Sequence, residues 1–201
     1  MSRVDRLDAQ GLRAALGDPH IVVLEETTST NDVAFRIAEG AKQAIVFAEC
    51  QSAGRGQHGK RWESAAGKGL WFSFLLQERT APNESWRITQ WAAETVAASI
   101  NEQFSLGAKV KPPNDVYVGA RKVAGVLLEL RAVPNAEHAG ILGIGINVNH
   151  AAEDFPPDLR DCAASLAMLT GKKIDRQALA VAVLRRLRSG HPREPFAINQ
   201  R

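Results

Sequence analysis

The sequence has little cysteine and no long hydrophobic run. Its two cysteines, Cys50 and Cys162, form no C-x-x-C pair and no metal-ligand spacing, so neither a disulfide framework nor a zinc site is indicated. The longest apolar stretch, residues 139–148, is far shorter than the roughly 20 residues needed to cross a bilayer. Residues 1–10 are too polar for a signal peptide. We therefore expect a cytoplasmic protein.

Low-complexity segments, internal repeats and a large charge excess are also absent. The chain has 201 residues, of which 45% are hydrophobic and 23% charged, and this composition is typical of an ordinary globular domain. Its net charge of +3 is too small for a general nucleic-acid surface. Basic residues are instead concentrated locally, because Arg55, Lys60 and Arg61 lie among and beside the glycines of residues 54–59. This cluster indicates a local anion site.

Hydrophobic periodicity predicts the main elements. Helical spacing predicts helices over residues 7–16, from about 31 to Gly40, over 85–104 and over 174–187. Alternating or β-branched segments predict strands over residues 21–24, 44–49, 69–76, 109–111, 116–118, 122–130 and 138–148. The strands between 109 and 148 follow one another through short turns, whereas parallel strands need a crossover helix. The pattern therefore favours one α+β domain with a largely antiparallel mixed sheet covered on one side by helices.

Residues 54–59 read Gly-Arg-Gly-Gln-His-Gly and match two phosphate-binding patterns. The dinucleotide-binding pattern requires a helix directly after the third glycine, whereas a polar segment and the strand at 69–76 follow here. The P-loop pattern requires Ser or Thr where Arg61 stands. The segment still allows backbone N–H groups to approach an anion closely, with cations beside them. A solvated surface hairpin is the alternative that the glycine spacing alone leaves open.

Five segments in chain order resemble the motifs of biotin protein ligases, the enzymes that attach biotin to carboxylase carrier domains. They are residues 28–32 (Thr-Ser-Thr-Asn-Asp), 49–62 (beginning Glu-Cys-Gln-Ser-Ala-Gly-Arg-Gly), 111–115 (Lys-Pro-Pro-Asn-Asp), 122–129 (Lys-Val-Ala-Gly-Val-Leu-Leu-Glu) and 143–149 (Gly-Ile-Gly-Ile-Asn-Val-Asn). The resemblance covers about three-fifths of the chain. It implies the class II synthetase-like fold of the biotin and lipoate ligases.

The resemblance also implies the activity of an AMP-forming biotin–[biotin carboxyl-carrier protein] ligase. In such enzymes the carboxylate of biotin attacks the α-phosphate of ATP, which gives biotinyl-5'-AMP and pyrophosphate, and a carrier lysine then takes the biotinyl group. The implied ligands are biotin, ATP and Mg²⁺, with the metal held mainly by the ATP phosphates. The implied partner is the biotin carboxyl carrier domain of a biotin-dependent carboxylase. A homodimer is left open, and neither DNA nor a membrane is expected as a partner.

Individual site residues follow from the same resemblance. Those expected to be catalytic are Lys122, Arg55 and Asp115. Those expected to bind biotin are Ser29, Thr30, Asn31, Gln51, Arg55, Gly56, Gln57, Lys122 and Gly125. Those expected to bind ATP or the adenylate are Gly54, Arg55, Gly56, Trp62, Asn114, Asp115, Lys122 and Asn147. The hydroxyl and amide groups of residues 29–31 suit the ureido ring of biotin, and Gly125 is expected to leave room for the biotin bicycle against the sheet.

Residue type alone leaves plainer roles open for several of these positions. Ser29 or Thr30 can cap a helix, the Asn-Asp pair at 114–115 suits a turn, and Lys122 can extend to water from the end of a strand. Trp62 can belong to the core and Asn147 to a turn.

The sequence departs from the family pattern at two positions. Gln57 stands where most members have arginine, and Pro112 replaces the usual tryptophan. We expect a catalytic domain over residues 1–189, a disordered tail over 190–201, and neither an N-terminal winged helix nor a C-terminal SH3-like domain. Two alternative functions are a lipoate or octanoate ligase or transferase of the same fold, and a biotin or nucleotide sensor without catalysis.

Overall fold

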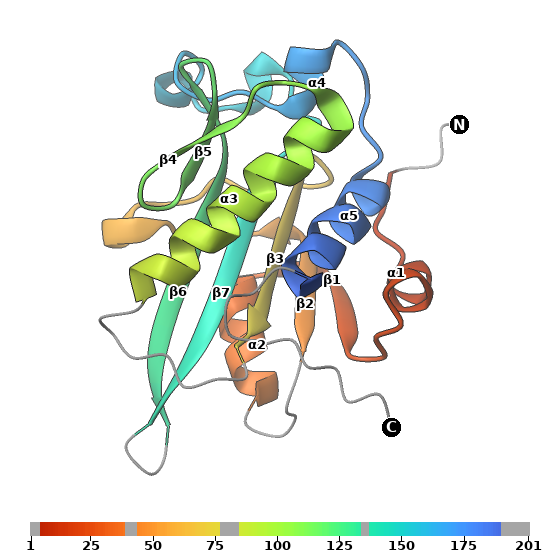
Figure 1. Ribbon diagram of the computed structural model, residues 1–201, viewed down its shortest axis with the longest axis vertical. Helices are drawn as coiled ribbons and strands as arrows, with labels where there is room; N and C mark the ends of the chain where they lie inside the picture. The colour runs from red at the N-terminus through yellow and green to blue at the C-terminus, as the bar shows by residue number, and fades with distance from the viewer. Residues whose placement is uncertain (1–4, 39–43, 77–84, 134–136, 190–201) are drawn as a thin grey trace.

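The computed structural model describes residues 5–38, 44–76, 85–133 and 137–189, and their strands form one seven-stranded sheet (Figure 1). In spatial order the strands are β1 (Ile21–Thr27), β2 (Ile45–Gln51), β3 (Gly69–Leu75), β7 (Glu137–Asn147), β6 (Arg121–Val133), β5 (Asp115–Val118) and β4 (Lys109–Lys111). The first pair, β1 and β2, is parallel, and every other neighbouring pair is antiparallel. The predicted α+β domain with a largely antiparallel mixed sheet is confirmed.

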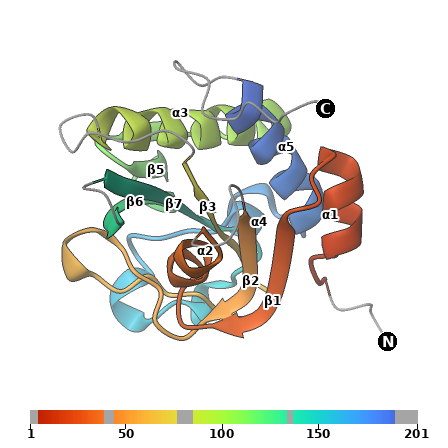
Figure 2. The same ribbon diagram turned by 90° about the horizontal axis from the view of Figure 1, so that it is seen from below.

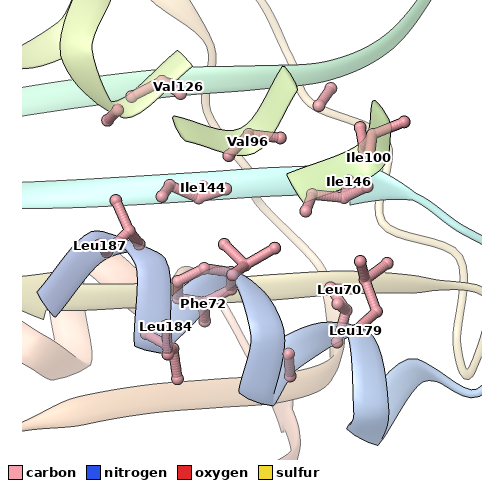
Figure 3. Close-up of a cluster of buried hydrophobic side chains, with 14 of the residues drawn as sticks. Leu70, Phe72, Val96, Ile100, Val126, Ile144, Ile146, Leu179, Leu184 and Leu187 are labelled. Atoms are coloured by element: carbon pink, nitrogen blue, oxygen red, sulfur yellow. The ribbon is translucent and has the colours of Figure 1, made fainter. Parts of the chain in front are cut away.

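The main core lies between one face of the sheet and the helices α3 (Ser85–Phe104) and α5 (Arg176–Ser189), with α1 (Ala9–Leu16) beside α5. Successive strand residues point to opposite faces, and Leu70, Phe72 and Phe74 of β3 belong to this core. Figure 3 shows Leu184 and Leu187 of α5 beside Phe72, and Val96 and Ile100 of α3 over the neighbouring strands. The regularly spaced apolar residues that predicted α3 are therefore the residues that this helix buries against the sheet.

A second helical layer covers the other face, so the prediction that helices lie on one side of the sheet only is wrong (Figure 2). The helix α2 (Thr30–Ala38) buries Ala34 against Val46 of β2 and Ile141 of β7. The first six residues of β3 are all buried. Because the large side chains at alternate positions dominated the pattern, the burial of the intervening residues was not evident from the sequence.

Most predicted boundaries agree closely with the structure. The bounds of α3 are those predicted, and Gly17 ends α1 with a φ of 61°. The helix α4 (Leu166–Thr170) was not predicted, since five residues are too few to show a helical period. The predicted helix end at Gly40 and the tail over 190–201 lie outside the described residues. Within the described residues, no helix is both long and apolar enough to cross a membrane.

A fully buried arginine at the start of α5 joins three distant parts of the fold. Nη1 of Arg176 donates to Glu49 Oε2 at 2.8 Å and to the Gly69 carbonyl at 3.0 Å, and Nη2 donates to the Asp5 carbonyl. The other oxygen of Glu49 accepts the Leu7 N–H at 2.7 Å. These bonds fix the end of β2 and the start of β3, which are the two strands that the glycine-rich segment connects.

Candidate functional site

The glycine loop, defined here as residues 54–61, folds back on itself after β2. The Trp62 N–H donates to the Gly54 carbonyl at 2.9 Å, which closes the base of the loop. A Cβ atom at Gly54 would lie 2.5 Å from the Trp62 carbonyl oxygen, so only glycine allows this close approach. The short 3₁₀ turn η1 (Gln57–Gly59) forms the tip. The segment is therefore a shaped turn beside the sheet.

A small cavity of about 50 Å³ lies between the glycine loop, the start of α2 and the strands β6 and β7. Its lining includes every residue to which the resemblance assigns biotin binding, namely Ser29, Thr30, Asn31, Gln51, Arg55, Gly56, Gln57, Lys122 and Gly125. Gly143 and Gly145 of β7 complete the floor. With Asn114 also in the lining, the fold brings residues from all five sequence motifs to one place.

A second cavity, of about 340 Å³, adjoins the first. The residues assigned to the adenylate that line it are Gly56, Trp62, Asn114, Asp115, Lys122 and Asn147. Gly54 and Arg55 are not part of its lining, because Gly54 closes the base of the loop and Arg55 lines the smaller cavity. His58, Lys60 and Arg61 of the loop form a basic wall.

Lys122 lies where the two cavities meet, since it lines both. Its Nζ is 2.6 Å from Asp115 Oδ1 and 5.1 Å from the centroid of the Trp62 ring. The side chain is 28% exposed. It is therefore a largely enclosed cation held by a carboxylate and an aromatic face, and not a strand-end lysine extended into water.

The indole of Trp62 lies against two glycines of the sheet, Gly125 and Gly145, and lines the smaller cavity with them. A Cβ atom at Gly125 would lie 2.8 Å from Cζ3 of Trp62, and one at Gly145 would lie 2.6 Å from Cε2. These two glycines pair across β6 and β7. In this structure the missing side chains make a flat surface for the indole, and the expectation that Gly125 leaves room for biotin stays a prediction.

Arg55 is bound by two carboxylates, an arrangement that the motifs did not predict. Its guanidinium donates to both oxygens of Asp32 at 2.9 and 2.8 Å and to both oxygens of Glu129 at 2.8 and 3.1 Å. Arg131 donates to the same two carboxylates, with 2.9 Å to Glu129. We call these four residues the charge cluster. It ties the glycine loop to α2 and β6.

The charge cluster shifts the pKa values of its members. The hydrogen bonds from Arg55 lower the pKa of Asp32 to about 2, against an opposing contribution from burial, and Arg131 adds to the effect. Burial alone would raise the pKa of Glu129, but the bonds from Arg55 and Arg131 outweigh it and the pKa is lowered. Both carboxylates are therefore charged at neutral pH and hold the loop through Arg55.

We expect trypsin to cut the glycine loop more slowly after Arg55 than after Arg61. The Arg61 side chain is 65% exposed and that of Arg55 is 35% exposed and paired. Asp32→Asn removes one charged partner of Arg55. Because this pair is partly exposed, we expect the substitution to weaken the attachment of the loop by only about 1 kcal/mol. Cutting after Arg55 should then become about fivefold faster. Mass spectrometry of timed digests measures the rates, and Glu25→Gln, in an exposed ion pair with Arg6, is the control. An unchanged rate in Asp32→Asn would mean that the cluster does not hold the loop.

A chain of aromatic rings runs from Trp62 away from the cavities. Trp62 meets Trp71 edge to face at 6.2 Å, Trp71 meets His150 in the same manner at 5.8 Å, and His150 stacks on Phe155 at 4.8 Å. Burial lowers the pKa of His150 to about 4. The imidazole is therefore neutral at physiological pH and supports the tryptophans by packing.

This histidine makes stability depend on pH. Its pKa is lower in the folded state than its ordinary value of 6.5, so the unfolded chain binds more protons below that value and stability falls as the pH decreases from 6.5 toward 4. The expected contribution is a loss of about 2 kcal/mol between about pH 7.5 and about pH 5. Denaturant titrations of the unaltered chain and of His150→Phe should differ in pH dependence by this amount. Equal pH dependence in both proteins would refute the assignment.

Hydrogen bonds that involve polar side chains connect the start of α2 to the sheet. The Thr30 N–H donates to Gln51 Oε1 at 2.8 Å, and Gln51 Nε2 donates to Ser64 Oγ at 2.9 Å. Ser73 of β3 contacts both Thr30 and Asn31. Thr30 and Asn31 are 4% exposed. The hydroxyl and amide groups at positions 30 and 31 thus belong to a buried network.

Several residues of the site were missed from the sequence, and three of them show why. Ser73 was read only as part of an apolar strand, although a serine among large apolar residues was a usable signal. Arg131 lies two positions after the last residue of a matched motif, and nothing in its surroundings marked it. Gly145 lay inside a matched motif without an assigned role, and its contact with Trp62 depends on the tertiary fold.

Two further positions have plain structural surroundings. Asn114 Nδ2 donates to the Val126 carbonyl at 2.9 Å, which holds the turn before β5 against β6. Pro112 is exposed and lines neither cavity. In the part of the chain that the structure describes, no group of three or more His, Cys, Asp or Glu residues is placed to hold a metal ion.

Comparison with known proteins gives a consistent result. The model of the biotin/lipoate A/B protein ligase family matches residues 22–147. The bifunctional ligase/repressor BirA of Bacillus subtilis is 33% identical over 176 residues, which make up 87% of this chain and 54% of the relative. The biotin–[acetyl-CoA-carboxylase] ligase of Mycobacterium tuberculosis is 32% identical over 196 residues, covering 90% of this chain and 69% of the relative.

Solved structures agree with the sequence comparisons. The biotin protein ligase from Aquifex aeolicus in complex with biotin and ATP superposes with a TM-score of 0.70 at 33% identity. The match covers 84% of this chain and 68% of that one. The chain spans about half the length of the Bacillus relative.

Proposed function

Because the chain belongs to the biotin/lipoate A/B protein ligase family, we propose that it activates biotin with ATP as biotinyl-5'-AMP and transfers the biotinyl group to a lysine of a biotin carboxyl carrier protein. One observation carries the proposal. Every residue assigned to biotin lines one cavity, which adjoins a second cavity lined by most of those assigned to the adenylate.

The position of Lys122 supports the first step. Attack of a carboxylate on a phosphate brings like charges together, and two of them about 4 Å apart repel by roughly 4 kcal/mol at an effective dielectric near 20. Lys122 lines both cavities, so its ammonium group is available to both reacting anions. A cation fixed before the reaction lowers the barrier without reorganisation.

The basic wall of the second cavity supports binding of the triphosphate. Lys60 and Arg61 are exposed residues of that wall, and His58 lies in the tip of the loop. Gln57 has no charge, and Arg55 is neutralised by the charge cluster. All three guanidinium nitrogens of Arg55 already donate to Asp32 or Glu129, whereas Lys122 and Arg61 each have one carboxylate partner. We therefore assign neutralisation of the phosphate charge mainly to Lys122, Lys60 and Arg61, and assign Arg55 the role of holding the loop.

The residues of the second cavity fit magnesium only as a companion of ATP. Its acidic residues are Glu63 and Asp115, and Asp115 is paired with Lys122 while Glu63 is paired with Arg61. No all-protein cage is available from these groups, whereas Mg²⁺ is commonly bound through substrate phosphates. When bound in this manner, Mg²⁺ reduces the negative charge that the attacking carboxylate meets.

The experiment that tests the proposal is ATP–pyrophosphate exchange. It is run with MgATP and no acid, with biotin, with lipoate or with octanoate. We expect exchange with biotin alone. Exchange with lipoate or octanoate instead would indicate a ligase for those acids. Binding of biotin, measured by calorimetry, without any exchange would indicate a sensor.

A further inference from the structure

Ser73 is a fully buried serine in the middle of β3 that the proposed function does not use. Its strand neighbours Phe72 and Phe74 belong to the main core, whereas Ser73 faces the start of α2. Its Oγ is 2.5 Å from Asn31 Oδ1 and 2.6 Å from Thr30 Oγ1. A buried hydroxyl costs free energy unless it is hydrogen-bonded, and here both partners are residues assigned to biotin.

Proton counting gives these bonds a direction. Each hydroxyl has one proton, and an amide oxygen only accepts. Ser73 therefore donates to Asn31 Oδ1, and Thr30 must donate to Ser73. Thr30 Oγ1 is also 3.0 Å from Gln51 Oε1, but its single proton serves the shorter contact, the 2.6 Å to Ser73 Oγ, and Gln51 Oε1 keeps the Thr30 N–H as its donor at 2.8 Å. The order is Thr30 to Ser73 to Asn31.

This order leaves the amino end of the Asn31 amide without an acceptor. Asn31 Nδ2 is buried and has no hydrogen-bond partner among the described residues. Hydrogen bonding from Asn31 is the smallest of the causes that lower the pKa of the nearby Glu129, whose well-aligned hydrogen bonds come from Arg55 and Arg131 and not from Nδ2. Asn31 lines the smaller cavity. An unpaired buried donor is destabilising, and an acceptor atom of a ligand would offset that cost.

We propose that Ser73 is a positioning residue for recognition of a cyclic urea: by holding Asn31 Oδ1, it turns Nδ2 toward the carbonyl oxygen of the ureido ring. The inference rests on the proposed function, because it takes biotin as the ligand of the smaller cavity. It adds the reason for a buried serine in an otherwise apolar strand. A ligand without an acceptor atom at this point leaves the amide unpaired, so the arrangement also favours biotin over other carboxylic acids.

The test is steady-state ATP–pyrophosphate exchange by Ser73→Ala. We expect the KM for biotin to rise about tenfold, equivalent to about 1.4 kcal/mol, while kcat and the KM for ATP change less than about twofold. Ser99→Ala is the matched control, since Ser99 is a buried serine of α3 whose hydroxyl donates to the Thr95 carbonyl. It should leave both KM values unchanged. If Ser73→Ala does not fold, Ser73→Cys fills the same space with a weaker donor and should raise the biotin KM alone.

A double-mutant cycle separates positioning from a general packing effect. In an Asn31→Ala background, Ser73→Ala should have almost no further effect on the biotin KM, because the group that it orients is gone. A full tenfold effect in that background would overturn the inference, as would an unchanged biotin KM in Ser73→Ala alone. Failure of the unaltered chain to catalyse exchange would overturn the proposed function, and this inference with it.

Discussion

Lys122→Ala is expected to lower biotin-dependent ATP–pyrophosphate exchange at least about 100-fold. Removal of one group that stabilises charge in an enclosed site typically costs about 3 kcal/mol or more. Lys122 is the cation that lines both cavities and lies against Trp62. Its loss also leaves Asp115 unpaired, which adds a negative charge close to the phosphates. The initial rate of exchange at saturating biotin and MgATP measures the effect.

A matched variant shows whether the effect is specific to the site. Lys109→Ala removes an exposed lysine of β4 that lines neither cavity, and its rate should stay within about twofold of the unaltered chain. Both variants should unfold at similar denaturant concentrations. If Lys122→Ala keeps more than about a third of the rate, a cost below about 1 kcal/mol, the assignment to the reaction is wrong and the lysine serves only the strand end.

Arg176→Ala is expected to lower the free energy of unfolding by about 3–5 kcal/mol. Arg176 is fully buried, and its partner Glu49 has a side chain that is only 7% exposed. Removing one member of a buried ion pair leaves the other charge uncompensated, which is the costly case. A single domain is stable by about 5–15 kcal/mol, so this variant should be near the limit of folding. Denaturant titration at neutral pH measures the change.

Arg186 provides the control on the same helix. It pairs with Glu102 at the surface, where the side chains are 47% and 71% exposed, and such pairs contribute at most about 1 kcal/mol. Arg186→Ala should therefore differ little from the unaltered chain. The double variant Glu49→Gln/Arg176→Met should recover part of the lost stability, because it removes both charges of the buried ion pair. A loss in Arg176→Ala as small as that in Arg186→Ala would refute the buried-pair assignment.

Local sequence pattern was sufficient for most of the fold. The periodic apolar residues of α3 and the alternating residues of β3 are repeated many times within one element, so each element could be recognised without its partners. The layer formed by α2 could not, because its position depends on the buried residues Ser73 and Ile141 of two strands distant in the sequence. Arg176 and Glu49 are 127 positions apart, and no local pattern relates them.

The candidate site was predicted through motifs, and the structure adds how the motifs meet. The residues assigned to biotin line one cavity, while their individual roles stay predictions. The pairing of Arg55 with Asp32 and Glu129 was not foreseen, because each residue lies in a different motif and the sequence gives no register between them. The position of Trp62 over Gly125 and Gly145 likewise depends on the packing of the loop on two strands.

Transfer of biotin to a carrier protein, which we propose for this chain, is measured by intact-mass analysis of a purified biotin carboxyl carrier domain after incubation with the chain, biotin and MgATP. We expect the addition of one biotinyl group, which is lost when ATP is omitted, when the target lysine of the carrier is replaced, or when Lys122→Ala is used. An unmodified carrier with the complete mixture, under conditions in which an authentic biotin ligase modifies it fully, would contradict the proposed function.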